Sequence, residues 1–596
     1  MIKKNFLYVT TGIFVLAMAI ACSDDSDISG TGSGSAENTD GSDSENSSSS
    51  SGSTIAEVIS ENEESFESSS DYTWDSSSVT TLTLDGSSAT SGSTSGVSID
   101  GSTITITAGG NYSFSGTLSD GKIIVNADGE TVRLIFAGVN ITNSTNAPVF
   151  IKKAEKVIVV LADGTSNILT DADSYSYLND DDEPNAALFS KTDLAIYGSG
   201  SLTVNGNYND GIASKDGLII KSGNITVNAE DDGIRGKDYL IVEGGTIHVT
   251  SGGDGLKSDN DDDEEDGYIY IEDGTINITA GNDGIQAETD IAIASGDLTI
   301  TSGGGSSESA SDASTKGIKA GVNLVIDGNT LTIDSSDDAI HSNGYLTING
   351  GTISITSGDD GIHADTSLSV NSGDITITKC YEGIESALLT INGGNISVVS
   401  DDDGINGAGG NDGSSYGNFT SGDNYLYING GYIYVNSTGD GIDVNGAIEM
   451  TGGTVIVNGP TSNSNGALDY DTTFKISGGF LVAAGSSGML QAPGTSSTQY
   501  SVAVGISESA GTLFNIQTSD GTTSLLTFSP AKTYQAVVFS SPDLTKGSSY
   551  DIYYGGSSTG TPENGLYTDG AYSGGTKYDS FTVSGMVTSV SSGGNR

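Results

Sequence analysis

Apolar residues recur along this chain in a fixed pattern of short segments. A step of acid, small residue and apolar residue, as in Asp360-Gly361-Ile362, is followed by residues 367–370 and 374–377, in which apolar and polar positions alternate. Alternation with a period of two places every second side chain on the same face, as in a half-buried strand. No segment has convincing helical periodicity. Each repeat therefore predicts three short strands, the third of them at the apolar residue that follows the small one.

The spacing of this step predicts a solenoid. Its small residue stands at positions 211, 233, 255, 284, 317, 339, 361, 383, 404 and 441, so most intervals are 21 or 22 residues and three are longer. A fixed period with occasional insertions is the signature of stacked repeats. Strands that run parallel to their equivalents one coil away form a parallel β-helix, and the crossover rule makes it right-handed. The predicted fold class is all-β, a right-handed parallel β-helix of about 22 residues per coil with β-rich N- and C-terminal caps.

The turn sequence Asn-Gly-Gly recurs at one corner of the repeats. It begins at Asn349, Asn392 and Asn429. Glycine adopts the positive φ that such a turn needs, and asparagine side chains stacked coil on coil can hydrogen-bond to one another. We therefore interpret this corner as scaffold.

The first 22 residues have the pattern of a bacterial lipoprotein signal. Lys3 and Lys4 precede an apolar run over 6–20, and small residues lead into Cys22. We expect Cys22 to be lipidated and the protein to be secreted and lipid-anchored to the bacterial cell surface or outer membrane. An ordinary secretory signal and an uncleaved anchor are the alternatives.

Composition divides the rest of the chain. Residues 23–70 are rich in Ser, Gly and acidic residues and have few large apolar ones, so we expect a disordered tether. Strands over 71–200 are spaced less regularly and are expected to form the N-terminal cap and the first coils. The regular β-helix is expected over 201–480, and the last coil with a β-rich C-terminal cap over 481–596.

The charge of the chain limits its partners. It has 78 acidic and 21 basic residues, a net charge of -57. Such a surface repels nucleic acid and anionic membranes, so no nucleic acid is expected, the only membrane contact is the lipid anchor, and cations are the expected companions. One of the two cysteines lies in the signal segment, so no disulfide framework is expected. We expect a monomer.

Acids just before the small residue form the main candidate metal site. Equivalent side chains in stacked coils lie ~4.8 Å apart, where two carboxylates repel each other. Calcium takes about six to eight oxygen ligands and can be shared by carboxylates at this spacing, so the expected cofactor is Ca²⁺. The alternative is that these acids only form turns by bonding backbone N–H groups. The candidate metal ligands are Asp231, Asp232, Asp254, Asp259, Asp283, Glu288, Asp337, Asp338, Asp359, Asp360, Asp402 and Asp403.

A second ladder lies two residues beyond the small residue, and it changes from basic to acidic along the chain. Because its apolar neighbour points inward, we expect this position to face solvent. Its bases either balance the charge of the acids or form a groove in which Arg235, Lys257, Lys319, His341 and His363 bind sugar. The two histidines, one coil apart, could also bind a transition metal, although the pattern supplies no third ligand. The ladder consists of Ala213, Arg235, Lys257, Gln286, Lys319, His341, His363, Glu385, Asn406 and Asp443.

Tyrosines provide a third feature. Several alternate with inward apolar residues and are therefore expected to point outward, where a ring can stack on a pyranose; high β-propensity is the alternative explanation. These residues are Tyr268, Tyr270, Tyr425, Tyr427, Tyr432 and Tyr434.

Particular motifs give the chain a family resemblance. They are Ala147-Pro148-Val149, the segment from Val157 to Asn167, the segment from Asn185 to Lys191, the segment from Asn207 to Ile212, the segment from Asp231 to Asp238, the segment from Asp254 to Asp259, and the segment from Gly466 to Asp471. With these motifs the chain resembles the bacterial carbohydrate-binding domain-containing proteins, which are calcium-bearing right-handed β-helices, known from a cellulose- and pectin-binding surface protein and remotely similar to pectate lyases. The resemblance implies noncatalytic polysaccharide binding, with calcium above all at Asp232, Asp254 and Asp259.

Three functions follow as hypotheses. The first is a lipid-anchored surface protein that binds cellulose or acidic plant glycans such as pectin, with calcium bridging sugar carboxylates to the acidic surface. The second is a polysaccharide lyase in which calcium acidifies a proton beside a uronate carboxylate and Lys257, Lys319 or Arg235 removes it. The third is a structural adhesin or stalk.

Overall fold

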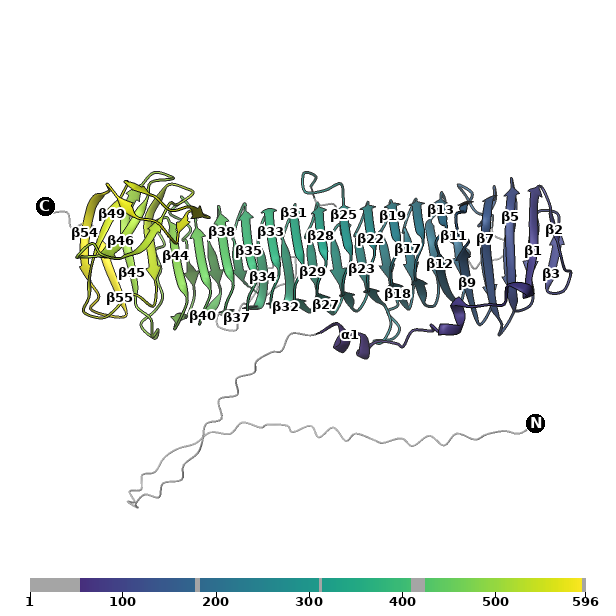
Figure 1. Cartoon of the computed structure of the whole chain (residues 1–596), viewed down its shortest axis with the longest axis horizontal. Coiled ribbons are helices and arrows are strands. Elements are labelled where there is room, and N and C mark those ends of the chain that lie inside the picture. Colours follow the sequence, from purple (N-terminus) through teal and green to yellow (C-terminus); the bar gives the residue numbers. More distant parts are fainter. Residues whose placement is uncertain (1–53, 177–182, 310–312, 409–423, 592–596) are drawn as a thin grey trace, which may run out of the picture. The chain divides into compact units, whose positions relative to one another are not determined.

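The structure is a computed structural model that describes residues 54–176, 183–309, 313–408 and 424–591. Most of these residues form a parallel β-helix, as predicted, in which equivalent strands of successive coils pair side by side (Figure 1). The predicted signal segment, Cys22 and the tether up to residue 53 lie outside the described residues. No described helix is long and apolar enough to cross a membrane.

The first face of the β-helix starts at the acid, small and apolar step. Its strands are β4 (Thr103–Ile106), β6 (Lys122–Asn126), β8 (Val149–Lys153), β11 (Ala186–Ser190), β14 (Asp210–Ser214), β17 (Ile234–Gly236), β20 (Leu256–Ser258), β23 (Ile285–Ala287), β26 (Ile318–Ala320), β29 (Ile340–Ser342), the starts of β32 (Ile362–Val370) and β34 (Ile384–Ile391), β36 (Ile405–Gly407), β39 (Ile442–Val444) and β42 (Asp469–Tyr470). Most have only three residues, of which the first and third are buried, as at Ile285 and Ala287.

The second face follows directly along the chain. Its strands are β1 (Val79–Gly86), β5 (Gly110–Leu118), the start of β7 (Thr131–Thr142), β9 (Lys156–Leu161), β12 (Asp193–Gly198), β15 (Leu218–Ile220), β18 (Tyr239–Val242), β21 (Tyr268–Ile271), β24 (Ile291–Ile293), β27 (Asn323–Ile326), β30 (Tyr345–Ile348), the ends of β32 and β34, β37 (Asn424–Ile428), β40 (Gly446–Met450) and β43 (Thr473–Ile476). β32 and β34 bend around the corner and so belong to two faces.

The third face closes each coil. Its strands are the end of β7, β10 (Ser166–Thr170), β13 (Ser201–Gly206), β16 (Asn224–Ala229), β19 (Thr246–Ser251), β22 (Thr275–Ala280), β25 (Asp297–Ser302), β28 (Thr330–Ser335), β31 (Thr352–Ser357), β33 (Asp374–Lys379), β35 (Asn395–Ser400), β38 (Tyr432–Ser437), β41 (Thr454–Asn458) and β44 (Phe480–Gly485). Inward and outward residues alternate along these strands, as the pattern of alternation predicts.

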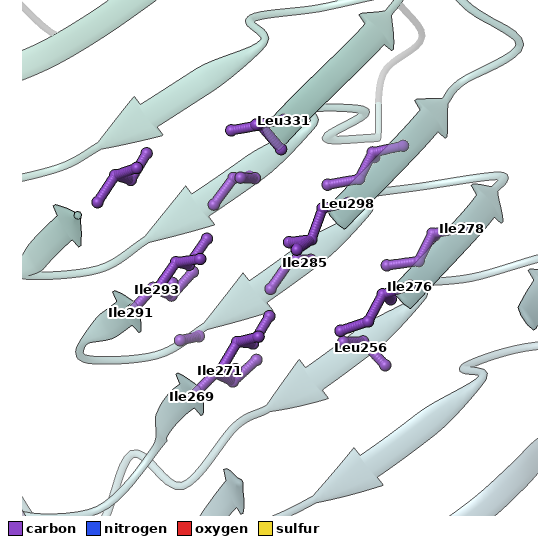
Figure 2. Close-up of a cluster of buried hydrophobic side chains, with 14 of the residues drawn as sticks. Leu256, Ile269, Ile271, Ile276, Ile278, Ile285, Ile291, Ile293, Leu298 and Leu331 are labelled. Atoms are coloured by element: carbon purple, nitrogen blue, oxygen red, sulfur yellow. The ribbon is translucent and has the colours of Figure 1, made fainter. Parts of the chain in front are cut away.

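The core is a column of stacked aliphatic side chains. Figure 2 shows side chains from the three faces, such as Leu256, Ile269 and Ile276, pointing into the same interior. All three are fully buried. Because each coil repeats the same inward positions, the core continues from one coil to the next without a boundary.

The predicted asparagine corner is confirmed. Asn371 Nδ2 donates to Asn349 Oδ1 at 2.8 Å, Asn392 Nδ2 donates to Asn371 Oδ1 at 2.8 Å, and Asn429 Nδ2 donates to Asn392 Oδ1 at 2.9 Å. The second glycine of the motif has the expected positive φ, 96° at Gly351.

Antiparallel strands close the two ends of the β-helix. At the N-terminal end β2 (Ala89–Ser91) pairs with β1, and β3 (Val97–Asp100) pairs with β4. Parallel pairing already starts with β1 and β5, so residues 71–200 contain coils of the β-helix as well as these capping strands. The spacing there is irregular because the twelve-residue β7 runs through a corner and pairs on two faces.

The C-terminal end carries further strands beyond the last coil. β45 (Ser501–Glu508), β48 (Tyr534–Ser540) and β55 (Val587–Ser591) extend the sheet from β44. A separate six-stranded sheet and a two-stranded one complete this part: β46 (Phe514–Thr518), β47 (Ser524–Phe528), β49 (Ser549–Tyr554), β51 (Pro562–Glu563), β52 (Leu566–Tyr567) and β54 (Thr576–Thr582), with β50 (Ser557–Ser558) and β53 (Tyr572–Ser573).

Residues 54–78, called the strap below, lie on the second face. They contain α1 (Ile55–Glu61), η1 (Ser69–Tyr72) and η2 (Ser76–Ser78), and α1 contacts β24 and β27. Val58 of α1 is buried against Ala292 and Val325. The prediction of a disordered tether up to residue 70 is therefore wrong from residue 54 onward. A few spaced apolar residues are enough to order this segment, because the surface of the β-helix is already there to pack against.

The strap should respond to pH through Glu63. Burial, and then the charges of Asp266, Asp238 and Asp193, raise the pKa of Glu63 to about 7. A carboxyl whose pKa is raised by a contact favours that contact below this pKa, so docking should weaken as the pH rises through about 7. We expect amide hydrogen exchange in 55–67, corrected for intrinsic rates, to be faster relative to the core at about pH 8 than at about pH 6.

Substitution distinguishes this effect from general destabilisation. Glu63→Gln should remove the difference between the two pH values, whereas Glu64→Gln, at an exposed position of the same strap, should leave it unchanged. An unaltered exchange profile in the wild-type protein across this range would contradict the role given to Glu63.

Candidate functional site

Two ladders of polar side chains run along the first face. The strand register pairs Arg235 with Lys257, His341 with His363, and His363 with Glu385, so the second ladder is stacked as its spacing predicts. Gln286 and Lys319 pair between them, and Asn406 and Asp443 pair further on. The acids of the first ladder lie three residues before these positions, so the two ladders lie side by side.

Several acids of the first ladder use one carboxylate oxygen to bond the backbone of the next coil. Asp232 Oδ1 accepts the backbone N–H of Asp254 at 2.9 Å, and Asp254 Oδ1 accepts that of Asp283 at 3.0 Å. The same bond joins Asp338 to Asp360 at 3.0 Å. These acids therefore have a structural role, but they bond the backbone of the next coil rather than that of their own turn.

The other oxygen faces the second ladder, which is basic in the N-terminal half. Lys257 Nζ lies 2.7 Å from Asp254 Oδ2 and 3.1 Å from Asp232 Oδ2. Arg235 Nε lies 2.9 Å from Asp259 Oδ1, and Lys319 Nζ lies 3.9 Å from Asp283 Oδ2. Side chains of this chain thus supply the cations here.

Four candidate metal ligands of this half, Asp232, Asp254, Asp259 and Asp283, face a lysine or arginine instead. Within the described ranges, neither they nor Asp231 and Glu288 join a cluster of three metal-ligating side chains. Asp337, Asp338 and Asp359 do cluster, but Lys316 Nζ lies 2.6 Å from Asp338 Oδ2 and 3.2 Å from Asp337 Oδ1. Among the predicted ligands, Asp360 and Asp403 belong to other clusters, and both lie further along the chain.

The ion pairs also bear on the lyase hypothesis. Burial of Lys257 opposes its charge, but Asp254 and Asp232 outweigh burial and raise the pKa of the ammonium well above its ordinary value. The pKa of Arg235 is raised by Asp259 and Asp210 in the same way. A base that removes a proton needs a pKa near the working pH, so this geometry does not favour either residue as a catalytic base.

The expectation that the second ladder faces solvent is wrong for several members. His341 and His363 are each 3% exposed, and Ala213 is buried as well. The side chains of Arg235, Lys257 and Lys319 are between 22% and 28% exposed. Neighbouring coils cover this position, because each side chain packs against the equivalent side chain of the next coil and against the acids beside it.

Beyond His363 the second ladder offers no ammonium or guanidinium group. Glu385, Asn406 and Asp443 follow in register, and the acids beside them are Glu382, Asp403 and Asp440. Burial comes first among the causes that raise the pKa of Glu385 to about 10, that of Asp403 to about 8 and that of Asp443 to about 7, and neighbouring carboxylates add to it. This half of the face therefore carries uncompensated acid groups.

One cluster in this half consists of oxygen ligands alone. Carboxylate oxygens of Asp403, Asp440 and Asp443 lie within 4.8 Å of one another. Asp403 Oδ1 accepts the backbone N–H of Asp440 at 2.6 Å, which leaves its second oxygen for a ligand. An all-oxygen set of this spacing fits Ca²⁺. Asp440 and Asp443 were not among the predicted metal ligands. The sequence does contain a sign of this cluster, because both ladders become acidic in this part of the chain.

The predicted tyrosines divide into covered and exposed groups. The strap covers Tyr268, which is 2% exposed and whose hydroxyl donates to Glu63 O at 3.0 Å, and Tyr270 packs against α1. Tyr432 and Tyr434 pack against the C-terminal core. For these four the expectation of an open sugar-stacking surface is wrong, because segments distant in sequence lie over them.

Tyr425 and Tyr427 remain a surface pair. Their rings are 5.8 Å apart and inclined by 11°, and Tyr425 is 38% exposed. Their strand, β37, contacts β36 and β39, which carry Asn406 and Asp443. A pair of parallel rings therefore lies on the strand next to the oxygen cluster.

Fold and site together define a parallel β-helix with a stacked ladder of charges on one face. The chain belongs to the carbohydrate-binding domain-containing protein family, whose model matches residues 100–361 and 359–549.

Two known proteins illustrate this likeness. A carbohydrate-binding domain-containing protein of Acetivibrio thermocellus is 48% identical over 136 residues, which are 22% of this chain and 48% of that protein. The chain thus spans about half the length of this curated relative. The solved structure of a polysaccharide lyase-like protein from C. thermocellum, as a gadolinium derivative, is 31% identical and covers 49% of this chain and 96% of its own, with a TM-score of 0.35.

Proposed function

We propose that this protein binds polysaccharide without cleaving it, and that calcium held by Asp403, Asp440 and Asp443 bridges sugar carboxylates to the acidic face. The observation that carries the proposal is the position of the parallel rings of Tyr425 and Tyr427 on the strand beside this oxygen cluster. Membership of a carbohydrate-binding family supports it.

The chemistry suits an acidic glycan such as pectin. The rings offer flat apolar surface for the face of a pyranose, and the ion offers coordination positions to a uronate carboxylate. Without a cation this part of the face would offer a uronate carboxylate no positively charged partner, since the second ladder has no basic member here. Ca²⁺ would also lower the repulsion among the three aspartates. Lipidation of Cys22 would place the binding surface at the cell envelope.

Calcium removal tests the proposal. We expect binding to immobilised polygalacturonate to fall at least about tenfold in excess EGTA and to return with added Ca²⁺, because both the bridge and the charge compensation are lost. Asp443→Asn should weaken binding similarly, whereas Asp231→Asn, which changes an acid of the first ladder outside the clusters, should not. Binding that is the same with and without EGTA would refute the calcium bridge.

A further inference from the structure

His363 lies where the second ladder changes from basic to acidic. Along the register Lys319 is followed by His341, His363 and Glu385. The whole chain has three histidines, and these two lie one above the other in the β-helix with their ring centroids 4.9 Å apart. Both rings are buried, so their nitrogens are aimed at protein groups.

His341 belongs to the basic half. Its Nδ1 lies 2.9 Å from Asp338 Oδ2, and its Nε2 lies 2.9 Å from Asn343 Oδ1. Lys316 Nζ lies 2.6 Å from the same Asp338 oxygen. Both ring nitrogens of His341 are therefore engaged at hydrogen-bond length, and the nearest carboxylate already has an ammonium partner.

His363 has a different environment. Its Nδ1 lies 3.3 Å from Asp360 Oδ2, and one ligand atom from each of Asp360, His363 and Glu385 lies within 4.8 Å of the other two. Ligands of a tetrahedral Zn²⁺ at about 2.0 to 2.2 Å are separated by about 3.3 to 3.5 Å. The distance between His363 Nδ1 and Asp360 Oδ2 is long for a hydrogen bond, and it equals the separation expected between two ligands of a tetrahedral Zn²⁺.

The far nitrogen of His363 supports the same interpretation. His363 Nε2 lies 3.4 Å from Asp365 Oδ1. Histidines that bind metals commonly present their other nitrogen to a carboxylate, which fixes the tautomer and the ring orientation. With Nε2 directed to Asp365, Nδ1 is directed to Asp360 at 3.3 Å and lies 4.0 Å from Asp338 Oδ2.

The carboxylates around this imidazole also favour a bound cation. Glu382 lies against Glu385 and accepts a hydrogen bond from Asn406 Nδ2 at 2.5 Å, so three carboxylates gather beside one ring. In the N-terminal half, the equivalent place between two acids is filled by Lys257. Glu382 and Glu385 are half-buried, which gives an ion a path from solvent.

We propose that Asp360, His363 and Glu385 bind a divalent first-row transition metal ion such as Zn²⁺, with Glu382 beside them as a further oxygen ligand. Imidazole nitrogen in the ligand set favours such an ion over Ca²⁺, which selects oxygen. This site differs from the oxygen cluster of Asp403, Asp440 and Asp443. It joins two successive coils, because Asp360 and His363 precede Glu382 and Glu385 by one repeat.

Metal titration tests the site in the full chain produced without a polyhistidine tag. With excess Ca²⁺ present to occupy oxygen-only sites, calorimetry should show tight binding of one Zn²⁺, and Co²⁺ should give the visible absorption of a low-coordinate ion with a nitrogen ligand. His363→Gln should weaken Zn²⁺ binding at least about 100-fold. His248→Gln, which alters the third histidine at an exposed position, should leave it unchanged.

Three results would overturn the site. They are wild-type affinity in His363→Gln, displacement of Zn²⁺ by Ca²⁺ at similar concentrations, and no Zn²⁺ binding by the wild-type protein. Circular dichroism checks that each variant is folded. Should His363→Gln fail to fold, Glu385→Gln at its half-exposed position carries the same test, with the same loss of affinity expected.

Discussion

Lys316→Met should destabilise the β-helix by about 3 to 5 kcal/mol, because it leaves the buried carboxylate of Asp338 without its lysine partner. Lys316 replaces the usual acid in one coil, and its ammonium lies 2.6 Å from Asp338 Oδ2 and 3.2 Å from Asp337 Oδ1. The side chain of Asp338 is 1% exposed, so water cannot take the place of the lysine. Urea denaturation followed by circular dichroism measures the change.

Two further variants make this prediction specific. Lys153→Met removes a lysine whose pair with Asp128 is exposed, and it should cost no more than about 1 kcal/mol. Lys316→Met combined with Asp338→Asn should recover much of the loss, because the buried charge goes with its partner. Equal effects of Lys316→Met and Lys153→Met would contradict the account.

Gly383→Val should destabilise the β-helix by about 3 kcal/mol, because the coils are too close for a side chain there. A Cβ at this position would lie 2.1 Å from the backbone oxygen of Gly404 and 2.4 Å from Val398 Cγ1. The backbone oxygen cannot move without breaking the ladder between the coils. The step needs a small residue for reasons of space, and its φ is not positive.

A glycine in open space provides the matched control. At Gly328 the nearest atom to an added Cβ is 3.9 Å away, and φ is again not positive. Gly328→Val should therefore change the free energy of unfolding by less than about 1 kcal/mol. If Gly383→Val lowered the free energy of unfolding as little as this control, the close spacing of the coils would not be the reason for the small residue at this position. Denaturation curves of both variants give the comparison.

Contacts that repeat from coil to coil could be predicted from the sequence. Each coil packs on a coil of the same kind, so spacing along the sequence predicts position in the structure. It predicted the step at Asp360-Gly361-Ile362 and the register from His341 through His363 to Glu385. The Asn349 corner followed in the same way. The spacing did not predict how deeply these side chains are buried. It predicted that the second ladder faces solvent, because it does not show that neighbouring coils cover this position.

Contacts that occur only once were not predictable. Nothing periodic indicates that residues 54–78 lie over Tyr268, or that the C-terminal strands cover Tyr432, since the contacting segments are separated by 205 residues from Glu63 to Tyr268 and by 131 residues from Tyr432 to Glu563. These contacts decide which tyrosines remain open, and they leave Tyr425 and Tyr427.

The sequence by itself thus determined the β-helix, its register and the two ladders, because a stacked repeat converts spacing into position. The tertiary structure decided which charges are paired. One oxygen of several acids bonds the next coil, and lysines and Arg235 lie at the other oxygen in the N-terminal half. After His363 the second ladder has no further basic member. Pairing depends on side-chain reach and burial, which a period does not specify.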